Sequence, residues 1–194
     1  MFRTLKIGLV AFAFFASGCS KSSETNHGNQ SATADGTGKY VDNVSEIISV
    51  QKGTGTHVPD FSWFDENGKK VTFAEFAKDD VVLINFWATW CGPCKEELPD
   101  LVALNDEYKG KNIKIIGISI DRDANVLSLV HDFAKQASMS YPIVIDNGDL
   151  ESAFGGIRGI PTSFFIDKNG NIVQKMLGLQ TKEIFRNALT HIAS

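Results

Sequence analysis

The chain has 194 residues, of which 43% are hydrophobic and 22% charged, a balance typical of a globular domain that can bury a core. Its formal net charge is −4, and no basic run follows the first few residues. We therefore expect no nucleic-acid partner, because nucleic acid is bound by clustered lysine and arginine. The three cysteines are too few for a disulfide scaffold, so each needs its own explanation.

The first 18 residues have the pattern of an export signal. Arg3 and Lys6 supply a positive start, and an apolar run follows that is shorter than the about 20 residues a membrane-spanning helix needs. Ala16-Ser17-Gly18-Cys19 resembles the lipobox of bacterial lipoproteins, although alanine replaces the usual leucine. The resemblance implies cleavage before Cys19 and lipidation of its sulfur. The alternative is an ordinary secretory signal followed by a stray cysteine.

Residues 19–55 are expected to form a flexible, lipid-anchored tether. The part from 20 to 38 holds no Leu, Ile, Val or aromatic residue, so it cannot bury enough apolar surface to fold. Apolar residues return between Tyr40 and Val50, which indicates a strand or a short helix at the edge of the domain and leaves the choice open. Gly53-Thr54-Gly55 breaks the chain again, and the folded domain is expected to span residues 56–194.

The rest of the chain alternates between strand and helix patterns. The first expected elements are a hairpin of strands at 61–64 and 71–73 and a short helix through Phe76 that begins at the capping box Thr72-Phe73-Ala74-Glu75. A strand at 81–86, a helix at 93–109 kinked at Pro99, a strand at 113–120 and a helix at 124–137 follow. The last expected elements are a strand at 143–145, one helical turn at 150–154, a hairpin at 162–166 and 172–177, and a closing helix at 181–192. This order predicts an α/β fold with a central mixed β-sheet flanked by helices on both faces.

Two cysteines stand where the strand at 81–86 gives way to the helix at 93–109. The positive end of the helix dipole stabilises a thiolate on the first, so we expect Cys91 to be a partly exposed nucleophile and Cys94, one turn deeper, to resolve the mixed disulfide. Half of a zinc site is the alternative, but no second CxxC exists. The four histidines are scattered without ligand spacing: His27, His57, His131 and His191. We expect no metal, and no cofactor beyond a redox-active Cys91–Cys94 disulfide.

Glu97 is expected to act together with the cysteine pair. Helical periodicity places it on the same stripe as Cys94, whereas Glu96 and Asp100 fall on the wet side. A carboxyl group turned toward the core has a raised pKa and can take the proton of the resolving thiol. The alternative is a solvated glutamate in the first helical turn. The other members of the stripe are Leu98, Leu101, Leu104 and Tyr108.

Two motifs resemble those of a thioredoxin: Trp90-Cys91-Gly92-Pro93-Cys94-Lys95 with Pro99 beyond it, and Gly156-Ile157-Arg158-Gly159-Ile160-Pro161-Thr162. The export signal, Pro59-Asp60-Phe61 with its hairpin, and an extra segment at 121–141 narrow the resemblance to the extracytoplasmic thioredoxin-like proteins of bacteria, of the TlpA/ResA/CcmG type. The resemblance covers residues 58–194. It implies a thioredoxin fold with an N-terminal β-hairpin extension and the cysteine pair at the tip of a strand.

The same resemblance implies a substrate-binding surface. It predicts a cis peptide before Pro161, in a loop opposite Cys91 where the backbone of Ile160 pairs with an extended substrate segment. Trp90, Gly92 and Pro93 are expected to complete this surface.

Other side chains near the motif receive structural roles. Trp87 is expected to pack around the site, Trp63 to lie in the core, and Asp121-Arg122-Asp123 to be a solvated loop. Thioredoxins carry a buried acid where this chain has Asn85, and the extracytoplasmic relatives suggest that Glu97 takes the role of that acid.

The function expected from these features is that of a thiol-disulfide oxidoreductase, lipid-anchored in the bacterial cell envelope and facing the periplasm or extracytoplasmic space. It would take electrons from a membrane donor of the thiol-reducing type and reduce disulfides in exported proteins, with cytochrome c maturation as one candidate pathway. An oxidase or isomerase is a second hypothesis. A thiol peroxidase is a third, although Thr89 stands two residues before Cys91 and not the three of a Thr-x-x-Cys arrangement. A tethered binding module with a structural disulfide is the non-enzymatic alternative.

Overall fold

The computed structural model describes residues 32–33 and 38–194, so the predicted signal peptide and the predicted lipidation of Cys19 lie outside the described part. An eight-stranded sheet carries the fold. Its strands are, in spatial order, β1 (Ala32–Thr33), β2 (Lys39–Val41), β3 (Val44–Glu46), β9 (Ile143–Ile145), β8 (Ile113–Ser119), β7 (Val81–Trp87), β10 (Thr162–Ile166) and β11 (Ile172–Leu177). The neighbours β3, β9, β8 and β7 are parallel and the outer pairs antiparallel, so the sheet is mixed, as predicted.

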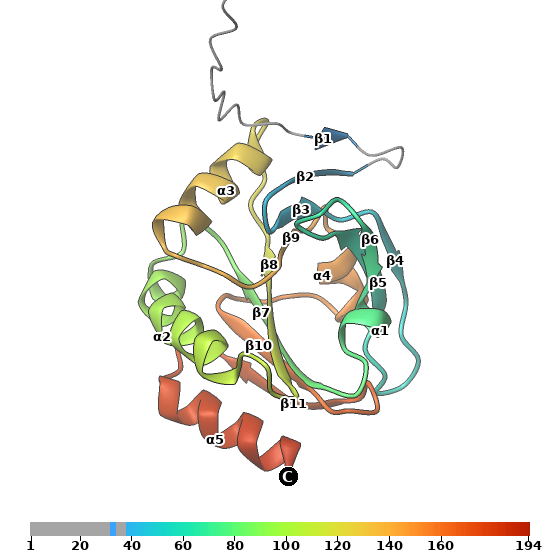
Figure 1. Cartoon of the computed structure of the whole chain (residues 1–194), viewed down its shortest axis with the longest axis vertical. Helices are drawn as coiled ribbons and strands as arrows, with labels where there is room; N and C mark the ends of the chain where they lie inside the picture. The colour runs from blue at the N-terminus through green and yellow to red at the C-terminus, as the bar shows by residue number, and fades with distance from the viewer. Residues whose placement is uncertain (1–31, 34–37) are drawn as a thin grey trace, which may run out of the picture.

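Different layers cover the two faces of this sheet (Figure 1). One face carries α2 (Gly92–Tyr108), α3 (Val126–Gln136) and α5 (Lys182–Ala193). The other carries α1 (Phe73–Phe76), α4 (Asp149–Ala153) and a small sheet of β4 (Ser49–Gln51), β5 (Asp60–Phe64) and β6 (Lys70–Thr72).

The central strand β7 shows why both faces must be covered. All seven of its residues are buried, and successive side chains of a strand point to opposite faces. Leu83 and Trp87 therefore pack under α2 and α3, whereas Ile84 and Phe86 pack against α4 and the small sheet. Trp63 of β5 is 2% exposed and belongs to this second core, as expected.

The apolar stretch near residues 40–50 forms strands and no helix. β2 and β3 extend the main sheet, and β3 pairs in parallel with β9 through Val44 and Ile143. The strand β4 then crosses to the small sheet, where it pairs with β5. The sequence alone did not decide between a strand and a helix here. Each of these strands has only three residues, so its local pattern is too short to fix the structure, and pairing with distant strands decides it.

The predicted cap of α1 and the predicted hairpin of β10 and β11 are both confirmed. Thr72 caps α1, since its Oγ1 accepts a hydrogen bond from the backbone N–H of Glu75 while the Glu75 carboxylate accepts one from the N–H of Thr72. The hairpin of β10 and β11 has the predicted bounds, and α2 continues through Pro99 to Tyr108. Among the described residues, no helix has the length and apolar character needed to cross a membrane.

Candidate active site

The cysteine pair lies where β7 ends and α2 begins. Cys91 is the N-cap residue of α2, and its Sγ accepts a hydrogen bond from the backbone N–H of Cys94 at 3.2 Å. Pro93 lies in the first turn of α2, where backbone N–H groups have no partner within the helix. The N–H that proline lacks therefore costs the helix no hydrogen bond. The amide and the helix dipole both favour negative charge on Cys91, which is the local physics expected of a thiolate nucleophile.

The two sulfur atoms form a disulfide, with 5.3 Å between the Cα atoms of Cys91 and Cys94. Cys91 is 5% exposed and Cys94 is 1% exposed, so both are buried in this oxidised state. The expectation that Cys91 is partly exposed is therefore wrong for the oxidised protein, because its sulfur is bonded inward to Cys94. Cys91 is nevertheless the more exposed of the two cysteines, as expected.

Glu97 lies on the buried face of α2, at 1% exposure, together with the other predicted members of the stripe. Its Oε1 accepts a hydrogen bond from the side-chain amide of Asn85 at 2.8 Å, and its Oε2 accepts one from the backbone N–H of Gln180 at 2.9 Å. Burial raises the pKa of Glu97 to about 7, and the two hydrogen bonds offset part of that effect. Near neutral pH this carboxyl group can therefore both hold and release a proton.

Asn85 fixes the orientation of the Glu97 carboxyl group. It is buried on β7, and its Nδ2 donates to Glu97 and also to Oγ of Ser163, at 3.0 Å, on the neighbouring strand β10. The sequence prediction missed Ser163 and Gln180. A serine among the apolar residues of a buried strand was the available signal for the first, whereas Gln180 acts through its backbone and leaves none.

The Ile160–Pro161 peptide bond is cis, as the motif predicted. The next residue, Thr162, pairs with Phe86 of β7, so the loop lies beside the end of β7 from which the cysteine segment starts. Its carbonyl groups are held from two sides, since the N–H of Gly178 donates to Pro161 and the hydroxyl of Thr162 donates to Gly159. The loop and the cysteine pair are thus built on two adjacent antiparallel strands.

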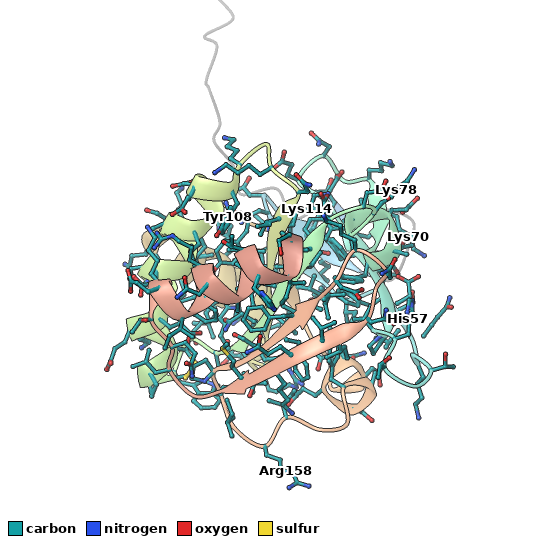
Figure 2. All side chains as sticks on the ribbon, turned by 90° about the horizontal axis from the view of Figure 1, so that it is seen from below. His57, Lys70, Lys78, Tyr108, Lys114 and Arg158 are labelled. Carbon is teal, nitrogen blue, oxygen red and sulfur yellow. A yellow bond between two sulfur atoms is a disulfide. The ribbon has the colours of Figure 1, made fainter. Side chains whose placement is uncertain are left out.

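Exposed apolar side chains lie at these loops. Trp90, directly before Cys91, is 66% exposed, and Leu177, whose strand β11 pairs with the start of β10, is 62% exposed. Trp87 differs, since it is fully buried and its ring packs against Phe133 of α3. Farther along the loop, Arg158 points away from the body of the protein (Figure 2).

The prediction of a solvated loop at Asp121-Arg122-Asp123 is wrong for its first residue. Asp121 is 2% exposed, and its carboxylate accepts hydrogen bonds from the N–H and the hydroxyl of Thr89, at 2.9 and 2.6 Å, and from the hydroxyl of Ser119. The loop that carries Cys91 leaves these donors inside the fold, and the buried carboxylate satisfies them. Asp123 is exposed, as expected.

Among residues 32–33 and 38–194, no three His, Cys, Asp or Glu side chains gather as a metal site would require. A CxxC disulfide at a helix N-terminus, beside a cis-proline loop in a mixed sheet, defines a thiol-disulfide oxidoreductase of thioredoxin fold.

Comparison with known proteins leads to the same class. Residues 54–175 match the AhpC/TSA family, and the chain belongs to this family. It is 38% identical over 138 residues to the thiol-disulfide oxidoreductase ResA of Bacillus thuringiensis subsp. konkukian, a match covering 71% of this chain and 78% of that protein. The ResA protein of Bacillus subtilis is 28% identical over the same length.

Solved structures agree with these sequence relatives. A thiol:disulfide interchange protein of the thioredoxin family from Chlorobium tepidum is similar with a TM-score of 0.65 and 31% identity, over 73% of this chain and 99% of that one. StoA from Bacillus subtilis is similar with a TM-score of 0.59 and 27% identity, over 69% of this chain and 98% of that one.

Proposed function

We propose that the protein reduces disulfide bonds in exported proteins while held at a membrane of the cell envelope by a lipid on Cys19. The observation that supports it most is the pairing of a helix-capping Cys91 with a buried carboxyl group, Glu97, whose pKa of about 7 suits proton transfer. The Gly92-Pro93 pair between the cysteines resembles that of reducing thioredoxins. The relatives named thiol-disulfide oxidoreductase support the class of reaction.

The proposed reaction begins from the reduced dithiol. The Cys91 thiolate attacks one sulfur of the client disulfide, which forms a mixed disulfide and releases the other client sulfur as a thiolate. Glu97 takes the proton of Cys94, and the Cys94 sulfur then attacks Cys91. This step forms the Cys91–Cys94 disulfide and releases the second client sulfur. The client gains two electrons, and a membrane donor of the thiol-reducing type returns two electrons to the enzyme.

The client is proposed to dock across the two loops of the site. An extended segment would pair with the backbone at Ile160 beside Pro161, as in strand addition at a sheet edge. The exposed Trp90 would cover apolar side chains of the client, and the open backbone at Gly92 and Pro93 would admit the client disulfide. Apocytochrome c is one candidate client in this scheme.

The thiol peroxidase alternative receives no support from the site. The hydroxyl of Thr89, the threonine nearest before Cys91, donates to Asp121 and is already committed to that buried carboxylate. An oxidase uses the same groups in the other direction, whereas an isomerase uses them to rearrange client disulfides with no net transfer of electrons. Reduction potentials in this fold range from about −270 mV to about −120 mV, and a reductase is expected near the lower value.

Client trapping tests the proposal. Cys94→Ala protein expressed in its native envelope should accumulate mixed disulfides through Cys91, because the resolving attack is lost. Denaturing gels without reductant, followed by mass spectrometry, would identify the trapped proteins. The matched control is Cys91→Ala, which keeps Cys94 but lacks the nucleophile and should trap nothing. Equal recovery from both variants, or none from Cys94→Ala, would contradict the proposed function.

A further inference from the structure

Two loops build the candidate site, and the segment after β8 connects them. In this segment, the carboxylate of Asp121 accepts hydrogen bonds from both the N–H and the hydroxyl of Thr89 in the loop that carries Cys91. The hydroxyl of Ser119 donates to the same carboxylate, which fixes it to the end of β8. The position of Thr89, two residues before Cys91, is therefore set by a carboxylate just beyond the end of the neighbouring strand β8.

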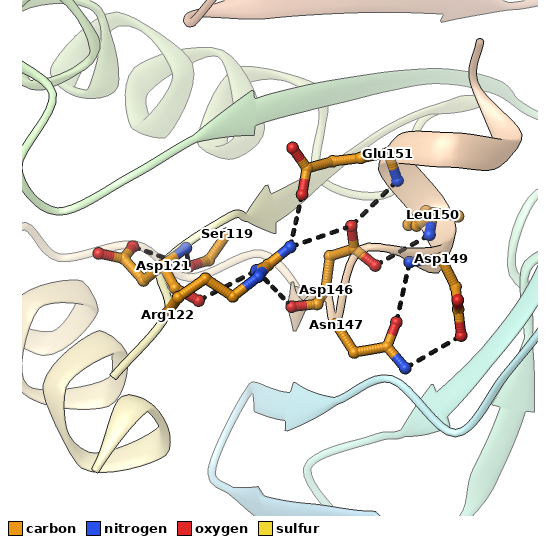
Figure 3. Close-up of polar contacts among 8 residues, drawn as sticks. All are labelled: Ser119, Asp121, Arg122, Asp146, Asn147, Asp149, Leu150 and Glu151. Carbon is orange, nitrogen blue, oxygen red and sulfur yellow. Dashed lines mark hydrogen bonds and ion pairs between the residues drawn. The ribbon is translucent and has the colours of Figure 1, made fainter. Parts of the chain in front are cut away.

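Arg122 continues the connection in the opposite direction (Figure 3). Its Nη1 donates to the backbone carbonyl of Asp121 at 3.1 Å and to that of Asp146 at 2.6 Å, and its Nη2 donates to the carboxylate of Glu151. The planar guanidinium thus spans the ends of β8 and β9 and reaches α4, a geometry that the single ammonium of a lysine cannot reproduce.

Asp146 transmits this contact to α4. Its side chain is fully buried, and its two carboxylate oxygens accept hydrogen bonds from the N–H groups of Leu150 and Glu151 in the first turn of the helix. Directly after α4, Phe154 packs against Phe86 and Phe164. The chain then runs through Gly155 and Gly156 to Ile160 and Pro161. We call this stretch, residues 155–161, the docking loop, and the position of α4 determines where it begins.

We propose that Asp121, Arg122 and Asp146 form a polar strut that sets the distance between the nucleophile and the client-docking loop. The hydrogen bonds of these residues go to the Cys91 loop, to the end of β9 and to α4, and not to Cys91 or Cys94, so we assign them as positioning residues for the reaction. Two carboxylates that are 2% exposed and fully hydrogen-bonded hold the strut in one geometry. The inference rests on the proposed docking of protein clients at Ile160.

The two ends of the strut should affect different substrates. A small disulfide needs only Cys91, whereas a protein disulfide needs Cys91 and the docking loop in register. Removing the Arg122 side chain also removes its bond to the Asp121 carbonyl, but the Asp121 carboxylate keeps its bonds to Thr89 and Ser119. The change should therefore act mainly on the docking side, and raise the KM for a protein disulfide while sparing a small one. Loosening Thr89 displaces the nucleophile, and should slow both reactions.

The test compares reduction of oxidised glutathione and of insulin by the reduced enzyme. For Arg122→Gln we expect KM for insulin to rise about tenfold, the scale of a displacement well below 1 Å, with the glutathione rate within about twofold of wild type. Lys135→Gln, which removes a positive charge from an exposed position on α3, is the matched control and should leave both rates unchanged. Equal losses on both substrates for Arg122→Gln, or no loss on either, would overturn the proposal.

The nucleophile side is tested with Thr89→Val, which removes only the hydroxyl bond to Asp121, and with Asp121→Asn. Both variants should lose rate on both substrates, while Thr89→Ser keeps the hydroxyl and should keep the rate. Asp123→Asn is the control, since it makes the same charge change at an exposed position of the same loop. Thermal unfolding shows which variants are folded, and a folded Thr89→Val with wild-type rates would refute this half of the strut.

Failure of the proposed function would appear in the wild-type enzyme, and not only in the variants. Wild-type enzyme that reduces oxidised glutathione but not insulin would overturn the reduction of protein clients, and the strut's role in docking with it. Failure of the strut alone would appear only in the variants, with the wild type active on both substrates.

Discussion

A single carboxyl group makes the environment of the cysteine pair unusual. Glu97 is almost completely buried, and both of its oxygens accept hydrogen bonds from groups on other elements, Asn85 of β7 and Gln180 before α5. These bonds favour the ionised form, but desolvation favours the neutral form more strongly, and the pKa rises from 4.5 to about 7. The group is thereby matched to proton transfer at neutral pH, where an exposed glutamate would be almost fully ionised and a weak base.

This pKa determines how the resolving step should depend on pH. Because the pKa of Glu97 is raised, the base form is scarce below about pH 7 and dominates above it, so the rate at which Cys94 resolves a mixed disulfide should rise with pH through about 7. In Glu97→Gln the rise through this range should disappear, and the rate should fall about 100-fold. Stopped-flow decay of a preformed mixed disulfide measures both effects.

The chain offers a control one residue away. Glu96 is exposed in the same helical turn, so Glu96→Gln makes the same chemical change without touching the buried carboxyl group. It should resolve the mixed disulfide like wild type. A pH profile that is unchanged in Glu97→Gln would show that the proton of Cys94 leaves by another route.

At the scale of elements, the site depends on how closely β7, β8 and the segment before β9 approach one another. Gly117 of β8 lies beside Asn85 in the sheet register, on the face that carries α2. A Cβ at this position would lie 2.9 Å from Nε1 of Trp87 and 3.3 Å from the ring of Tyr141, both of which are buried. The missing side chain therefore makes room for the two aromatic rings beside Asn85 and Glu97.

Gly117→Ala should consequently destabilise the fold, by about 1–3 kcal/mol, since neither buried ring can move without displacing its neighbours. Urea unfolding of the oxidised protein measures the difference. Gly92→Ala is the matched substitution, because a Cβ there meets nothing within 4 Å, and its stability should stay within about 0.5 kcal/mol of wild type. A fully stable Gly117→Ala would contradict the close packing described for this face.

Sequence patterns predicted the elements well where the periodic signal is long. The stripe of α2 identified Glu97 as buried, and the β10–β11 hairpin was predicted to its end residues. Asp121 was predicted wrongly, because a run of charged residues is normally solvated and its partner Thr89 is 32 residues away. The contact of Gln180 was beyond prediction for another reason, since any residue but proline supplies that backbone N–H.

At the scale of the whole molecule, the strand order separates the N-terminal part from the chemistry. β2 and β3 lie beyond β9 and β8 (Figure 1), whereas Cys91 follows the end of β7 and the proposed docking loop precedes β10. The predicted tether is shortened at its end, because Ala32 and Thr33 form β1 in the sheet. For the proposed tether, the about 12 residues between Cys19 and β1 would span about 20 Å as a flexible coil. The proposed anchor would therefore hold the domain close to a membrane surface.

The proposed lipidation can be tested directly. Cys19→Ala should remove the acceptor sulfur, so the protein should move from the membrane fraction to the soluble envelope fraction and no longer incorporate labelled fatty acid. The Cys91–Cys94 pair should remain intact, and the rate with oxidised glutathione should match that of the wild type. Membrane association and label that persist in Cys19→Ala would contradict the anchor.

The strand order has a consequence for the way such a protein can be used. Three strands, β9, β8 and β7, stand between the hairpin of β2 and β3 and the strand β10, so the proposed tether would enter the sheet near the edge opposite to β10 and β11. In the proposed function, the segment ahead of the sheet serves to deliver the domain and not to carry out the reaction. Exchanging the proposed tether should therefore deliver the same thiol-disulfide oxidoreductase domain to another surface, or release it into solution.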